Sequence, residues 1–168
     1  MEKHRSLCVG PRSIWLPLAG IAAGLVLVSA LLAAAKNWLW KGDPYGIVEL
    51  FRLNAENNIP SFYSGLLLLI DAGLLTVVWW ARVDDGWRRW VWSLLVLLFV
   101  FLAFDELFEV HERLIKPLRE AWNLSGLLYN AWVVVYAPAA GLLGIVFLPI
   151  WLRLKPLHRL RFAASAIL

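Results

Sequence analysis

Residues 90–112 read WVWSLLVLLFVFLAFDELFEVHE, an apolar run that ends in a cluster of charged side chains. A helix of about 20 apolar residues has the length needed to cross a hydrocarbon core of roughly 30 Å. A run of this kind leaves an apolar surface on every side of the helix, which lipid can cover. The stretch is therefore predicted to span a membrane.

Three further runs of the same character are predicted to span the membrane at residues 13–35, 61–81 and 124–151. All of them should be helices, because a spanning backbone must satisfy its own hydrogen bonds and these segments are too few to close a barrel. The predicted fold is all-α, a bundle of four transmembrane helices. It should form a single integral membrane domain over residues 1–168.

The composition supports this prediction. The chain is 61% hydrophobic and 17% charged, with a mean hydropathy of +0.69, which is too apolar for a soluble domain of this size. The single cysteine, Cys8, excludes an intrachain disulfide and a cysteine metal cluster.

The distribution of lysine and arginine predicts the orientation. Ten of them lie before the first span, between the second and third spans, or after the fourth span, against six on the opposite side. Because cytoplasmic segments carry the excess of these residues, both termini are expected in the cytoplasm. The net charge of +4 is thereby explained by membrane insertion, and no nucleic-acid partner is expected. The first outer loop contains Tyr45, Ile47 and Phe51, and is expected to lie on the lipid surface.

The acidic end of the third span is the strongest functional signal. At about 100° per residue along this helix, Asp105, Glu109 and Glu112 are predicted to form one stripe, with Glu106 to one side and His111 projecting away. Residues 56, 57 and 130 should lie at the same depth in the membrane as Asp105, near the non-cytoplasmic face. The predicted polar or ion site therefore comprises Glu56, Asn57, Asp105, Glu106, Glu109, His111, Glu112 and Asn130.

Carboxylates with one imidazole suit a divalent cation such as calcium, manganese, iron or zinc. The candidate metal ligands are Glu56, Asp105 and Glu109; no other cofactor is indicated. A simpler interpretation stays open, because Glu109 with Arg113 and Glu112 with Lys116 have the spacing of helical ion pairs.

Asp71 lies ten residues into the second span, about 15 Å deep. A charged group is costly at that depth, so the carboxyl should be neutral or hydrogen-bonded toward the bundle. Tyr136 is expected at a similar depth and is its predicted partner. The pair is interpreted as a proton-handling site or as a packing contact.

Residues 53–64, LNAENNIPSFYS, together with Phe104-Asp105-Glu106 and His111-Glu112, resemble an uncharacterised group of small four-span bacterial membrane proteins. The resemblance implies a bacterial cytoplasmic (inner) membrane protein. It implies no activity.

Two function classes remain. The first is a non-enzymatic subunit or binding protein of a larger membrane complex, whose partners would be membrane lipids and another membrane protein or a second copy of the chain. The second is a small metal-dependent or acid-base membrane enzyme, or a transporter, acting on a lipid or hydrophobic solute. Four short helices enclose little volume, which favours the first class.

Overall fold

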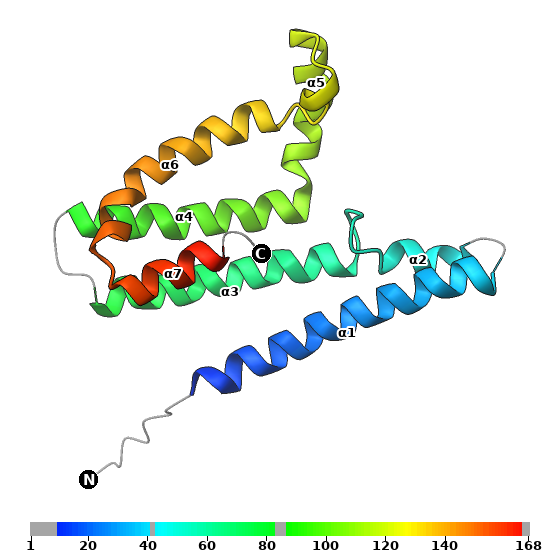
Figure 1. Ribbon diagram of the computed structural model, residues 1–168, viewed down its shortest axis with the longest axis horizontal. Coiled ribbons are helices and arrows are strands. Elements are labelled where there is room, and N and C mark those ends of the chain that lie inside the picture. Colours follow the sequence, from blue (N-terminus) through cyan, green and yellow to red (C-terminus); the bar gives the residue numbers. More distant parts are fainter. Residues whose placement is uncertain (1–9, 41–42, 83–86, 166–168) are drawn as a thin grey trace. The chain divides into compact units, whose positions relative to one another are not determined.

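The computed structural model describes residues 10–40, 43–82 and 87–165, and every regular element within them is a helix (Figure 1). Within these residues, four helices are long and apolar enough to cross a membrane: Arg12–Trp38, Ile59–Ala81, Arg89–Phe108 and Val133–Arg153. The predicted all-α class with four membrane-spanning helices is confirmed. The orientation of the termini and the single-domain organisation stay predictions.

The elements follow the order α1 (Pro11–Trp38), η1 (Pro44–Gly46), α2 (Ile47–Leu50), α3 (Ile59–Arg82), α4 (Trp87–Phe108), α5 (Val110–Trp122), η2 (Gly126–Leu128), α6 (Val133–Arg153) and α7 (Pro156–Ser165). They divide into two compact units, Met1–Leu66 and Leu67–Leu168. The spans lie on α1, α3, α4 and α6.

In the first unit, a buried asparagine fixes the start of α3. The Asn58 side chain accepts the backbone N–H of Ser61, and the Ser61 hydroxyl oxygen accepts the backbone N–H of Asn58, both at 3.0 Å. Asn58 Nδ2 also donates to the carbonyl of Arg52 at 2.6 Å. This reciprocal cap satisfies backbone donors that a helix start leaves open. One turn further, the Tyr63 hydroxyl donates to the carbonyl of Leu18 on α1 at 2.6 Å.

In the second unit, α6 runs back beside α4, whereas α5 turns away at the end of α4 and runs across the direction of both helices (Figure 1). The buried side chains include Val91 and Ala103 of α4 and Ala131, just before α6. Of these, Ala103 and Ala131 are small enough to allow backbones in a membrane to approach closely. The second unit therefore forms a tight corner where α4, α5 and α6 meet.

The ends of two spans differ from the prediction. The third was expected to continue to Glu112, but α4 ends at Phe108 because Glu109 adopts the left-handed conformation, with φ 53° and ψ 44°. The fourth was expected to begin at Leu124, but α6 begins at Val133. Gly126 has a φ of 62°, and the polar Ser125 and Asn130 interrupt the apolar run before α6.

Candidate functional site

The carboxylate of Asp105 is the centre of the corner. Asp105 is only 7% exposed. Its Oδ1 accepts a hydrogen bond from the backbone N–H of His111 at 2.9 Å and another from the hydroxyl of Tyr136 at 2.8 Å. Oδ2 lies 3.0 Å from Nδ1 of His111. A buried carboxylate needs such partners, because an unpaired charge in an apolar surrounding is costly. One acid thus joins the end of α4 to the first turns of α5 and α6.

The break at Glu109 brings His111 to Asp105. On a continuous helix, residues six positions apart point about 120° away from one another. The prediction that His111 projects away from the acids is wrong, since the left-handed residue redirects the chain before α5 begins. His111 faces back onto Asp105 through both its backbone and its ring.

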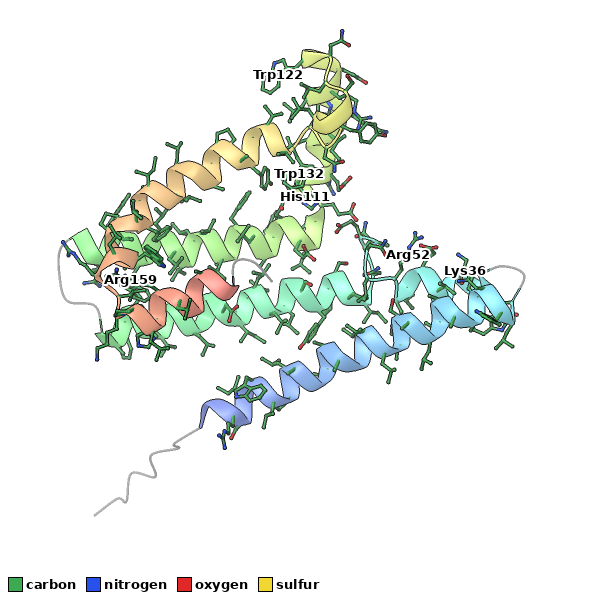
Figure 2. The ribbon with its side chains drawn as sticks, viewed as in Figure 1. Lys36, Arg52, His111, Trp122, Trp132 and Arg159 are labelled. Atoms are coloured by element: carbon green, nitrogen blue, oxygen red, sulfur yellow. The ribbon has the colours of Figure 1, made fainter. Side chains whose placement is uncertain are left out.

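Trp132 packs against the rings of both His111 and Tyr136. Its ring meets that of His111 edge-on, with centroids 5.5 Å apart and an interplanar angle of 70°, and that of Tyr136 at 5.5 Å and 82°. Figure 2 shows His111 and Trp132 lying together where α4 ends and α6 begins. Such edge-to-face contacts are favourable beyond the area they bury. The sequence-based prediction did not include Trp132, which was attributed to no site.

Tyr136 has a different partner from the predicted one. It was matched in depth with Asp71 on the assumption that the fourth span begins at Leu124. Because α6 begins at Val133, Tyr136 lies in its first turn and donates to Asp105 instead. The predicted pairing of Tyr136 with Asp71 is therefore corrected.

The contact with Asp105 determines what the imidazole can do. An ionised carboxylate only accepts hydrogen bonds, so in contact with an ionised Asp105 the donor is Nδ1 of His111, and Nε2 of a neutral ring would then present a lone pair. Nε2 lies 3.9 Å from Oε1 of Glu112. The His111 side chain is 16% exposed and that of Glu112 45%, so Glu112 is the more accessible of the two.

The other acids do not form the predicted stripe with Asp105. Glu106 is half-buried on α4, Glu109 occupies the break, and Glu112 is exposed on α5. These positions belong to three differently directed parts of the backbone, so the single helix face assumed in the prediction does not exist. Asn130 is exposed, and its backbone carbonyl accepts the N–H of Val133 at 3.0 Å.

Glu56 and Asn57 belong to the first unit, where both are exposed. Their convergence with Asp105 stays a prediction. Within residues 10–40, 43–82 and 87–165, no three His, Cys, Asp or Glu side chains are grouped closely enough to hold a metal ion.

Asp71 lies on an exposed face of α3. It lines a hollow of about 250 Å³ with Leu74, Leu75 and Val78 of the same helix and Phe99 of α4. The carboxyl thus has apolar neighbours within the second unit.

Helix α5 completes the corner and was not predicted as a separate element. Its apolar residues recur at positions 110, 114, 115, 118 and 122, the spacing of an amphipathic helix. That periodicity and the change from apolar to charged residues after Phe108 were the signals available. Arg119 ties α5 to the following loop, since Nη2 donates to the carbonyl of Tyr129 at 3.0 Å and the guanidinium lies 3.8 Å from the Tyr129 ring centroid.

Comparison with known protein families gives a match over most of the chain. Residues 20–168 match the family described as Domain of unknown function (DUF8692). The matched range contains most of α1 and all the later helices, so the whole corner around Asp105 falls within it. No curated protein and no solved structure matches the chain.

Proposed function

The chain belongs to the DUF8692 family, and we propose that it serves as a non-enzymatic integral membrane subunit or binding protein of a larger membrane complex. The Asp105 corner would lie at the non-cytoplasmic face of a bacterial cytoplasmic membrane, with both chain termini in the cytoplasm. The lysine and arginine count supports this orientation.

The use of Asp105 within its own chain carries the proposal. Both carboxylate oxygens are engaged by His111 and Tyr136. An acid held in this way stabilises the junction of three helices, and it is poorly placed to bind a substrate at the same time. The corner is better suited to hold a surface in a fixed shape than to carry out a reaction.

The surface held by the corner is the polar side of α5. Its exposed charged residues are Glu112, Arg113, Lys116 and Glu120. Both signs of charge occur along one short helix, which favours a partner protein with complementary charges. The partner would be another membrane protein or a second copy of this chain.

One observation favours the alternative of a small acid-base membrane enzyme. The Oδ2 of Asp105 lies 3.0 Å from Nδ1 of His111, and a carboxylate on one ring nitrogen is the arrangement that orients a histidine for proton transfer at the other. Its substrate would be a lipid or hydrophobic solute that reaches Nε2.

Native mass spectrometry after gentle extraction, combined with metal analysis, separates the two functions. The wild-type chain should remain in a complex, and Asp105→Ala should lose it. Because Asp105→Ala removes a buried acceptor and can unfold the corner, a double variant, Arg113→Ala with Lys116→Ala, tests the exposed surface directly. It should weaken the complex while leaving the monomer folded.

A wild-type chain that is always monomeric would contradict the subunit function. A stoichiometric metal that is lost in Asp105→Ala would support the metal-dependent form of the alternative. Turnover of an added lipid that is abolished by His111→Gln would support its acid-base form.

A further inference from the structure

An apolar hollow lies at the opposite end of α4 and α6 from the Asp105 corner. Its volume is about 270 Å³, and its lining is wholly apolar. The lining residues are Val91, Trp92 and Leu95 of α4 with Phe147, Ile150 and Trp151 of α6. Ligand pockets for drug-sized molecules begin at roughly 300 Å³, so the hollow suits a hydrocarbon chain better than a bulky solute.

A basic segment adjoins this hollow. Leu154, which also lines it, is flanked in sequence by Arg153 and Lys155, and both are exposed. Arg159 of α7 folds back onto the end of α6. Its Nε donates to the carbonyl of Leu154 at 2.8 Å, and its Nη2 donates to the carbonyl of Leu152.

The charge of Arg159 is therefore at the rim of the hollow. Its guanidinium lies 5.8 Å from the ring centroid of Trp151, and Figure 2 shows Arg159 beside the end of α6. The two carbonyl contacts use only part of its donor capacity, since a guanidinium has five N–H groups. Donors remain for an anionic ligand.

We propose that this hollow binds one acyl chain of an anionic phospholipid, whose phosphate is bound by Lys155 and Arg159. An apolar slot beside a cluster of cations is the combination that recognises such a lipid, because neither a neutral lipid nor a soluble anion uses both parts. The site is separate from the Asp105 corner and does not depend on the function proposed for it.

A simpler role for the same cations is to stabilise the end of α6 and to fix the orientation of the chain. Lys155 distinguishes the two roles. It begins the connection to α7, where its backbone carbonyl accepts the N–H groups of His158 and Arg159, so removing its side-chain charge leaves these backbone bonds intact.

The test is native mass spectrometry of the full chain titrated with phosphatidylglycerol or phosphatidylcholine of the same acyl chains. The wild type should retain one phosphatidylglycerol at least about fivefold more tightly than phosphatidylcholine, which corresponds to one surface cation. Lys155→Gln should reduce phosphatidylglycerol affinity by about fivefold and leave phosphatidylcholine unchanged. Lys116→Gln on α5 is the matched control and should alter neither.

Two further variants test the hollow itself. Leu95→Trp or Ile150→Phe should fill it and abolish retention of phosphatidylglycerol. Equal binding of the two lipids, an unchanged preference in Lys155→Gln, or retention that survives both filled variants would each overturn the proposal. So would a second copy of the chain found at this face in place of lipid.

Discussion

Asp105 is the residue on which the corner depends, because three groups converge on its carboxylate. Of these groups, the Tyr136 hydroxyl comes from the most distant part of the chain. A hydrogen bond to a carboxylate is worth more than one between neutral groups, whereas interhelical hydrogen bonds in membranes contribute modestly on average. The contribution of Tyr136 should lie between these limits.

Tyr136→Phe is expected to lower the free energy of unfolding by about 1 to 2 kcal/mol. The measurement is SDS-induced unfolding in mixed micelles, followed by circular dichroism. Tyr129→Phe provides the control, since the described contact of Tyr129 with Arg119 is made by its ring and its backbone carbonyl. If both substitutions had the same effect, the Tyr136 hydroxyl would not support the corner.

Among the helices, α5 is the element that depends most on a single backbone conformation. Glu109 has a φ of 53°, where a side chain is strained and glycine is not. Glu109→Gly is therefore expected to leave stability unchanged or raise it by up to about 1 kcal/mol. Glu112→Gly is the matched control inside α5, and it should destabilise by about 1 kcal/mol.

The same SDS titration measures both glycine variants. A large loss of stability in Glu109→Gly would mean that the Glu109 carboxylate, and not the break, holds the corner. Loss of the complex without loss of stability would instead assign Glu109 to the contact with a partner.

At the level of the helices, the sequence predicted the spans but not the contacts at their ends. The length and apolar content of the segments predicted the four spans, because the thickness of the hydrocarbon core sets the length of a span and its apolar character sets the composition. The contact between Asp105 and His111 was missed because a helical projection assumes regular dihedral angles, and one left-handed residue at Glu109 invalidates it for every later position. The start of α6 was missed because Leu127 and Leu128 make the sequence look apolar from Leu124 onward. Gly126 and Asn130, which interrupt this run, were given too little weight.

For the molecule as a whole, orientation determines which side of the membrane the Asp105 corner faces. An even number of spans puts both termini on one side, and four helices in the described part of the chain have the required length and composition. Asp105 lies near the end of α4, far in sequence from Arg89 at the start of that span. The corner and the apolar hollow should therefore lie toward opposite sides of the membrane.

Reporter fusions test this orientation. A reporter that is active only in the cytoplasm should work when fused after Leu168, and one that is active only outside should work when inserted near Gly42, because the excess of lysine and arginine lies on the side of the termini. Exchanging the two reporters between these sites should abolish both signals, which controls for expression. The opposite pattern would place the Asp105 corner in the cytoplasm, where α5 would meet soluble partners. It would also move the apolar hollow and its adjoining basic segment to the outer leaflet.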